Sequence, residues 1–178
     1  MDELIEKSLH GDIEAYNDLI NMILPLLYNI ARTRVSSVED INDIIQETIF
    51  KSYKNLHQLK DKKYFKAWII KILKNECYNF NNKLYRENKI LEKIKILKYS
   101  HLNSNIEEKT ISNLDFELSL KNLNEDEKTI VILYYKYGYH INEIASVFDE
   151  KAENIKSKLY RARIKIKHNR EEGNNNVK

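Results

Sequence analysis

The chain contains few of the residues that β-rich folds and cross-linked secreted domains require. Its 178 residues include 3 glycines and 1 proline. Because hairpins need such turn residues, their scarcity argues against a β-rich fold. The single cysteine, Cys77, excludes an intrachain disulfide and is typical of a reducing compartment.

Signals for secretion and for membrane insertion are also missing. The first residues, Met1-Asp2-Glu3, are acidic, whereas a secretory signal begins with basic residues. The most apolar run, residues 19–31, is interrupted by Pro25 and by asparagines and is shorter than the ~20 apolar residues that span a bilayer. We therefore expect a cytoplasmic protein with no membrane insertion.

The sequence carries no enzymatic signature. Its 5 histidines are scattered without the spacing of a metal site, and it has no glycine-rich loop of the kind that cradles phosphate groups. Cys77 falls on an apolar stripe and reads as a small core residue. We expect no catalytic residue, no metal site and no cofactor, and the protein is not predicted to be an enzyme.

What the sequence does have is an apolar repeat of helical period along almost its whole length, which predicts an all-α fold. Asp12 and Asn124 are expected to cap helices, Glu127 to complete a capping box with Asn124, and Gly138 to end the helix that follows. Pro25 should bend or interrupt the first long helix. Helices are expected at about residues 12–30, 39–55, 64–83, 113–121, 124–137 and 152–167.

The pattern loosens between residues 88 and 112, so we predict two small helical domains joined by a flexible linker. The expected boundaries are a first domain at 1–87, a linker at 88–112, a second domain at 113–170 and a disordered tail at 171–178. The net charge of +3 is modest, but its distribution is uneven. Acidic residues gather at 2–43 and basic residues at 51–98 and 151–170, which suggests one surface for a polyanion and another for a different partner.

Residues 124–167 read as a helix-turn-helix. Ala145 is small enough for two helices to cross closely, and Ile155, ten residues later, anchors the second helix. Phe148 closes the core between them, and residues 149–151 form the turn. An apolar stripe of Ile155, Leu159, Ala162 and Ile166 leaves a polar and basic face on the other side of this helix, as a DNA major groove requires.

Several segments together resemble conserved regions of bacterial sigma factors. Residues 40–53 (DINDIIQETIFKSY) and 65–75 (FKAWIIKILKN) are similar to the second conserved region. Residues 123–127 (LNEDE), 139–145 (YHINEIA) and 156–163 (KSKLYRAR) are similar to the fourth. Two such regions separated only by a short linker resemble the extracytoplasmic-function (ECF) group of the sigma-70 family, over nearly the whole chain.

The resemblance implies a specificity subunit that binds RNA polymerase core and directs promoter-specific transcription initiation. In the family, the outward face of the second helix binds the clamp of the largest polymerase subunit, and the flap of the second largest subunit is a further contact. An acidic, amide-bearing helix face suits a protein partner and repels DNA. The matching residues here are Asp40, Asp43, Gln46 and Glu47.

The third helix and the loop before it match the part of the family that captures the single-stranded minus-ten element. Leu59 stands where relatives often carry phenylalanine, which leaves the base preference open. Phe65 and Trp68 read as core residues. The expected minus-ten contacts are Leu59, Lys60, Lys62, Lys63, Lys71, Asn75, Tyr78 and Asn79.

The last helix matches the family's reader of the minus-thirty-five element. It departs from many relatives by having Ala152 where proline often begins the helix and Glu153 where glycine is frequent. Base edges are expected to meet Glu153, Asn154, Lys156, Ser157 and Tyr160. Phosphates are expected to meet Lys158, Arg161 and Arg163.

Family members are commonly held by an anti-sigma factor, and we expect one here by resemblance. Two alternatives stay open. A helix-turn-helix regulator that binds duplex DNA as a dimer would not need the acidic helix at 40–51. A helical adaptor that binds only proteins would show no salt-dependent affinity for DNA.

Overall fold

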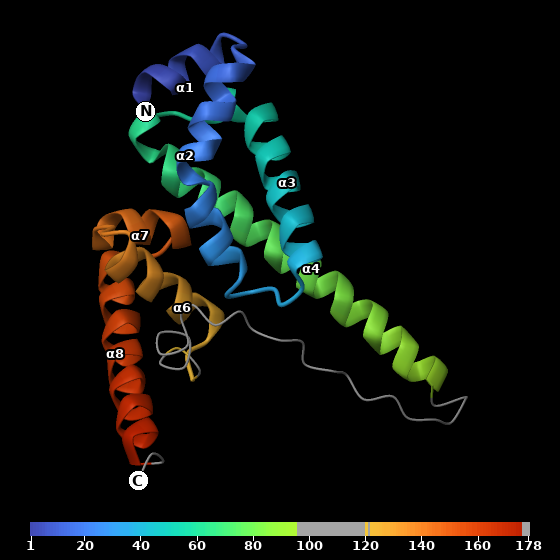
Figure 1. Cartoon of the computed structure of the whole chain (residues 1–178), viewed down its shortest axis with the longest axis vertical. Helices are drawn as coiled ribbons and strands as arrows, with labels where there is room; N and C mark the ends of the chain where they lie inside the picture. Colours follow the sequence, from blue (N-terminus) through green and yellow to red (C-terminus); the bar gives the residue numbers. More distant parts are fainter. Residues whose placement is uncertain (96–119, 121, 176–178) are drawn as a thin grey trace.

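The computed structural model describes residues 1–95, 120 and 122–175, and the regular structure in these residues is all helical (Figure 1). The predicted all-α class is confirmed. The N-terminal half contains α1 (Asp2–Leu9), α2 (Ile13–Ala31), α3 (Val38–Lys54), the 3-10 turns η1 (Leu56–Gln58) and η2 (Lys62–Tyr64), and α4 (Phe65–Lys95). The C-terminal half contains α6 (Glu125–Val131), the π-helical turn η3 (Ile132–Lys136), α7 (Ile141–Phe148) and α8 (Ala152–Asn175).

Side-chain caps start the helices of the N-terminal half. The carboxylate of Asp12 accepts the Ala15 N–H at the start of α2, as predicted, and the Ser37 hydroxyl accepts the Asp40 N–H at the start of α3. The apolar faces of α2, α3 and α4 then meet in one core. Its largest fully buried side chains include Leu19, Leu27, Ile30, Phe65, Ile69 and Leu73.

The helix α3 is held to α2 by a buried tyrosine. The Tyr16 hydroxyl donates to the Ile49 carbonyl at 2.8 Å and lies 2.6 Å from the Ser52 hydroxyl. Burial raises the pKa of Tyr16 to about 12, so the phenol keeps its proton at neutral pH. This contact fixes which face of α3 points to solvent.

Pro25 was predicted to bend or interrupt the first long helix, and the interruption is wrong, because α2 runs unbroken from Ile13 to Ala31. A proline removes one helical hydrogen bond, to the carbonyl four residues before it. Here both Pro25 and Asn21 are exposed, so that carbonyl is not enclosed in the core. The Pro25 carbonyl itself accepts from the Asn29 amide at 2.7 Å.

Two helices are longer than predicted. The helix α4 continues to Lys95, so residues 88–95 of the expected linker are helical, and its second part extends away from the other helices (Figure 1). The helix α8 continues to Asn175, so residues 171–175 of the expected tail are helical too. Residues 84–95 contain no glycine or proline and are rich in strong helix formers, which explains the first extension. The rest of the linker, the expected helix at 113–121 apart from Leu120, and residues 176–178 lie outside the described residues.

The predicted capping box is confirmed in the C-terminal half. The Asn124 side chain accepts the Glu127 N–H at 2.8 Å, and the Glu127 carboxylate accepts the Asn124 N–H at 3.0 Å. The helix ends, as predicted, just before Gly138, whose φ of +68° suits glycine. Between them, η3 is a turn that sequence reasoning missed, marked by the Tyr137 N–H bonded to the Ile132 carbonyl at 3.2 Å.

The helix-turn-helix is present where it was predicted. The side chains of Ala145, Ile155, Leu159 and Ala162 are buried, and Ile166 packs against the same core. Asp149 ends α7 in the left-handed backbone region with a φ of +52°. The helix α7 also lies against α4, so the two halves of the chain are in contact (Figure 1).

Candidate nucleic-acid and protein interfaces

The outward face of α3 is acidic in the structure. Its buried side is formed by Ile41, Ile44, Ile45 and Thr48. Asp43, Gln46 and Glu47 are exposed, and Asp40 is half-buried. The Glu47 carboxylate lies 3.2 Å from the Lys51 ammonium, which in turn lies 2.7 Å from Glu76 of α4. The hydrogen bond to Glu76 is the main reason why the pKa of Lys51 is raised.

An exposed aromatic residue continues this acidic face. Phe50 is three residues after Glu47 and four after Gln46, so it shares their side of the helix. Its side chain is 61% exposed. Sequence reasoning did not single it out, although an apolar residue at an outward position of the helical repeat was the signal.

The loop before α4 places its predicted lysines beside acidic residues. Lys62 is paired with Glu6 of α1, and the Lys63 ammonium lies 2.8 Å from the Asp61 carboxylate. Lys60 is exposed. Leu59 is partly buried against the core, so it serves packing in the partner-free chain.

On α4 the predicted minus-ten residues divide into two groups. Asn75, Tyr78 and Asn79 are exposed and share one side, as their spacing of three and four requires. Lys71 is instead paired with Asp149 of the C-terminal half, with 2.5 Å between ammonium and carboxylate.

The inner stripe of α4 contains the residues predicted to be core. Phe65 is fully buried, and Trp68 is partly buried beside it with 6.1 Å between ring centroids. Cys77 is buried, and burial raises the pKa of its thiol to about 11, which keeps it protonated and unreactive. The interpretation of these three as structural residues is confirmed.

The polar face of α8 is open to solvent. Tyr160 is 63% exposed. The Ser157 hydroxyl donates back to the Glu153 carbonyl at 2.9 Å. The predicted contact residues that lie exposed on this helix are Glu153, Asn154, Lys156, Ser157, Tyr160, Arg161 and Arg163.

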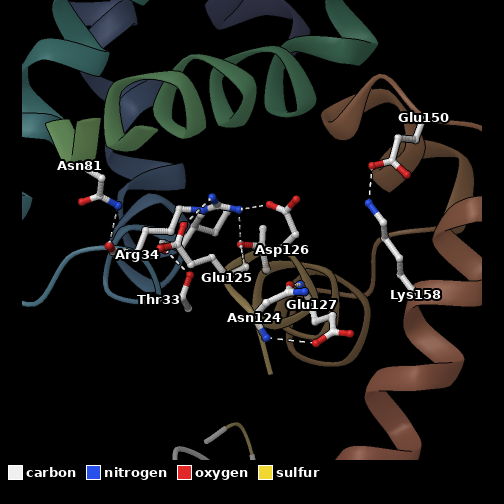
Figure 2. Close-up of polar contacts among 11 residues, drawn as sticks. Thr33, Arg34, Asn81, Asn124, Glu125, Asp126, Glu127, Glu150 and Lys158 are labelled. Carbon is white, nitrogen blue, oxygen red and sulfur yellow. Dashed lines mark hydrogen bonds and ion pairs between the residues drawn. The ribbon is translucent and has the colours of Figure 1, made fainter. Parts of the chain in front are cut away.

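Lys158 differs from the other predicted phosphate contacts. It is half-buried and paired with Glu150 (Figure 2). Its ammonium lies 5.8 Å from the centroid of the Phe148 ring. The ion pair ties α8 to the turn that precedes it. In the partner-free chain, Lys158 therefore stabilises the turn between α7 and α8.

Arg163 is held over two tyrosine rings. Its Nε donates to the Tyr135 hydroxyl at 2.5 Å, and its guanidinium carbon lies 5.6 Å and 5.7 Å from the centroids of Tyr135 and Tyr134. Such a cation–π arrangement restricts the position of the arginine side chain. Tyr135 belongs to the π-helical turn and was not singled out from the sequence.

A buried arginine joins the two halves. Arg34 follows α2, and its side chain is only 6% exposed. Its guanidinium donates to Asp126 at 2.6 Å, to Glu125 at 3.2 Å and to the Thr129 hydroxyl at 3.2 Å, all from α6 (Figure 2). The Asn81 amide of α4 donates to the Arg34 carbonyl at 3.2 Å. The C-terminal half thus supplies the acids that surround this cation.

A second contact between the halves lies at the turn of the helix-turn-helix. The Lys74 ammonium lies 3.5 Å from the centroid of the Phe148 ring. Burial lowers the pKa of Lys74 to about 8, although Asp126 nearby opposes the shift. The Tyr137 hydroxyl also donates to the Pro25 carbonyl of α2 at 3.1 Å.

Family comparisons identify the chain. Residues 19–87 match the family model described as Sigma-70 region 2, and residues 114–166 match the one described as Sigma-70, region 4. The chain belongs to the sigma-70 family. Two regions in this order favour a sigma factor over a dimeric helix-turn-helix regulator or a protein-only adaptor.

Relatives place this sigma factor in the ECF group. It is 26% identical over 179 aligned residues to the ECF RNA polymerase sigma-E factor of Haemophilus influenzae, covering 93% of this chain and 92% of that one. It is 28% identical over 137 residues to the RNA polymerase sigma factor SigV of Bacillus subtilis, covering 76% and 78%. Sigma factors of this family act in transcription initiation without being enzymes.

Solved structures share the fold of this sigma factor. The sigma factor RpoE of Bartonella quintana, in complex with the anti-sigma factor NepR, gives a TM-score of 0.68 at 22% identity, covering 88% of this chain and 96% of that one. CnrH, in complex with the cytosolic domain of CnrY, gives a TM-score of 0.65 at 20% identity, covering 93% of each chain.

The region 2 match contains the acidic face of α3 and the exposed side of α4, and the region 4 match contains α7, the turn and α8 as far as residue 166. Among the described residues no group of three or more His, Cys, Asp or Glu side chains is arranged to hold a metal ion. In the same residues no helix combines the length and the apolar character needed to cross a bilayer.

Proposed function

We propose that this ECF sigma factor binds polymerase core through the acidic face of α3. We further propose that its N-terminal half binds the minus-ten promoter element and its C-terminal half the minus-thirty-five element. The arrangement of exposed side chains is the observation that carries this proposal. An acidic face lies on α3, and a polar and basic face lies on α8. The two chemistries suit a protein partner and a nucleic acid, respectively.

The face of α3 is assigned to the clamp of the largest polymerase subunit. Asp43, Gln46 and Glu47 supply two carboxylates and an amide, and Asp40 lies beside them. Phe50 adds an exposed apolar surface at the edge of the same face. An aromatic residue beside charged side chains is a common composition for a protein interface. The flap of the second largest subunit is assigned to the C-terminal half.

The exposed side of α4 is assigned to the single-stranded minus-ten element. Tyr78 offers a stacking surface, while Asn75 and Asn79 offer hydrogen-bonding amides on the same side. Stacking of a base on an aromatic ring contributes about 1–3 kcal/mol per base. Lys60, Lys62, Lys63 and Lys71 are assigned to its phosphates, and Leu59 to the loop that selects a base.

The open face of α8 is assigned to the minus-thirty-five duplex. Tyr160, Lys156, Ser157, Asn154 and Glu153 are placed toward base edges, and Arg161, Arg163 and Lys158 toward phosphates. Arg163 is already restricted by Tyr135, so less rotational freedom is lost when it binds a phosphate. Lys158 must leave Glu150 to make its contact.

An anti-sigma factor is proposed to restrain this protein. The support is the likeness in fold to RpoE of Bartonella quintana, which was solved with the anti-sigma factor NepR. We further propose that the chain catalyses no reaction itself and acts in the cytoplasm, where polymerase and promoter DNA are found.

Run-off transcription tests the proposal. Purified protein added to polymerase core should give promoter-specific transcripts on at least one native upstream fragment. Gln46→Ala with Glu47→Ala should reduce affinity for core while leaving the helical content unchanged. The matched control, Asn17→Ala with Asp18→Ala, likewise removes one amide and one carboxylate, from an exposed part of α2, and should bind core normally. Normal core affinity in the Gln46 and Glu47 variant would refute the docking assignment.

A further inference from the structure

The contact between the two halves is divided by charge. Among the described residues, the ion pairs that cross it join cations of the N-terminal half, Arg34 and Lys71, to acids of the C-terminal half, Glu125, Asp126 and Asp149. Lys74 lies beside these pairs, over the Phe148 ring and near Asp126. We call this contact the seam. Figure 2 shows Arg34 of the seam reaching from the end of α2 to the acids at the start of α6.

The three cations form one cluster on the N-terminal half. Lys71 and Lys74 are three residues apart on α4 and therefore share a side of that helix. Arg34 is close enough to Lys74 to lower its pKa by repulsion, and the Asn81 amide of α4 holds the backbone of Arg34 beside the helix. When the C-terminal half leaves, Arg34 and Lys71 lose their carboxylate partners, Lys74 loses the Phe148 ring, and the three remain as a basic surface.

The proposed function requires the seam to open. The two halves of the chain read separate promoter elements, so α7 cannot stay packed against α4 in the way that the partner-free chain shows. Lys71 is already assigned to a phosphate of the minus-ten strand. The carboxylate that it now contacts, on Asp149, is an anion of the same charge as a phosphate group.

We propose that the acidic edge formed by Glu125, Asp126 and Asp149 takes the place of a nucleic-acid backbone on the basic surface formed by Arg34, Lys71 and Lys74. In the partner-free chain this edge occupies a phosphate-binding surface, and a single DNA strand competes for it. The inference rests on the proposed function and adds Arg34 and Lys74 to its phosphate contacts. Arginine suits both occupants, because its planar fork pairs with carboxylate and phosphate alike.

The competition distinguishes the seam from a simple packing contact. If the acids mimic a strand, neutralising them should open the chain and also raise its affinity for single-stranded DNA. If the cations are the strand's ligands, neutralising them should open the chain and lower that affinity. If the contact served only to hold the halves together, neutralising its acids and neutralising its cations would give the same affinity for single-stranded DNA.

The test compares three variants of the full chain. Asp126→Asn with Asp149→Asn removes two acids of the seam with little change of shape, and asparagine tolerates the left-handed backbone at 149. The cation variant, Arg34→Gln, removes the cation that pairs with both Glu125 and Asp126. The control, Glu14→Gln with Asp18→Asn, makes the same change in net charge as the first variant on the exposed side of α2.

Two measurements are needed: the radius of gyration by small-angle X-ray scattering, and the affinity for a labelled single-stranded DNA oligonucleotide of mixed sequence. The acid variant should be larger than the wild type and should bind the oligonucleotide about five- to tenfold more tightly, the lower range for coupled sites. The cation variant should be larger too and bind more weakly. The control should match the wild type in size and gain less affinity than the acid variant.

Two results would overturn the proposal. One is an acid variant that binds DNA no better than the control, and the other is a cation variant with unchanged affinity. Neither depends on polymerase, so promoter-specific transcripts from the wild type would leave the proposed function standing even if the seam proposal failed.

Discussion

Replacing Glu127 tests how the start of α6 and the recognition helix α8 are held together. This residue is 4% exposed, and its carboxylate accepts three hydrogen bonds. One comes from the Asn124 N–H at 3.0 Å, and two contacts, at 2.9 Å and 2.7 Å, come from the ammonium of Lys165 on α8. Glu127→Ala should therefore loosen the start of α6 and its contact with the middle of α8 at once.

The size of the effect follows from these contacts. A capping hydrogen bond contributes about 1 kcal/mol. A bond between charged groups contributes about 1.5–3 kcal/mol, but the Lys165 side chain is 41% exposed, so solvent screening places it at about 1 kcal/mol here. Glu127→Ala should cost about 2 kcal/mol in total, and Glu127→Gln, which keeps an acceptor for the Asn124 N–H, about 1 kcal/mol.

Hydrogen exchange is the suitable assay, because the single tryptophan, Trp68, lies in the N-terminal half and would not report on α6. Two kcal/mol corresponds to a fall of about 30-fold in the protection of amides at residues 125–136. Protection in α2 and α3 should change little. Glu153→Gln, on the exposed face of α8, serves as the control.

The pH dependence separates charge from shape. Burial raises the pKa of Glu127, but the bond to Lys165 and the Asn124 N–H outweigh it, so the pKa is lowered overall. A lowered pKa means that the contribution is present above the ordinary carboxyl pKa and is lost as pH falls through the folded-state value. The difference between wild type and Glu127→Gln should thus shrink below about pH 4. Equal protection at neutral pH, or a difference that does not change with pH, would refute this reasoning.

Three further outcomes are expected. Ile155→Ala should destabilise the helix-turn-helix by about 2–5 kcal/mol, because the side chain is fully buried, and an unchanged thermal melt of amides in α7 would contradict this. Arg161→Ala should weaken binding to all promoter sequences and should reduce by about 1 the slope of the logarithm of DNA affinity against the logarithm of salt concentration. An unchanged slope would show that Arg161 does not contact a phosphate. Closure of the seam should strengthen as pH rises from about 8 towards 10, since the lowered pKa of Lys74 means that its protonated form disfavours closure. This closure is measured as a smaller radius of gyration at pH 9.5 than at pH 7.5, and Lys74→Met should abolish the difference. The charged groups that act on Lys74 are Asp126, Arg34, Lys158 and Glu150.

Local patterns in the sequence predicted what depends on neighbours along the chain. The stripe from Ile155 to Ala162 and the capping box of Asn124 and Glu127 each involve residues only a few positions apart, so the helical repeat reveals them. The outward faces of α3 and α8 followed as the complement of those stripes. Family resemblance then supplied the roles that remain proposals for these faces.

Contacts between distant residues could not be predicted in the same way. Arg34 and Asp126 are 92 positions apart, and no local pattern selects one acid among several as the partner of a given cation. Lys71 and Lys158 were expected at phosphates for this reason, although the partner-free chain pairs them with acids. The full length of α4 was missed for another reason. Residues 84–95 carry no signal that ends a helix, but their apolar periodicity is weak and therefore resembled that of a linker.

The corner at Asp149 restricts both backbone and charge at one position. Glycine, asparagine and aspartate adopt its left-handed conformation at little cost, but of these only aspartate offers an anion to Lys71. A single change to glycine would therefore keep the helix pair intact while releasing one link between the two halves. One mutational step can therefore weaken the contact that holds the two halves together without destabilising the helix-turn-helix.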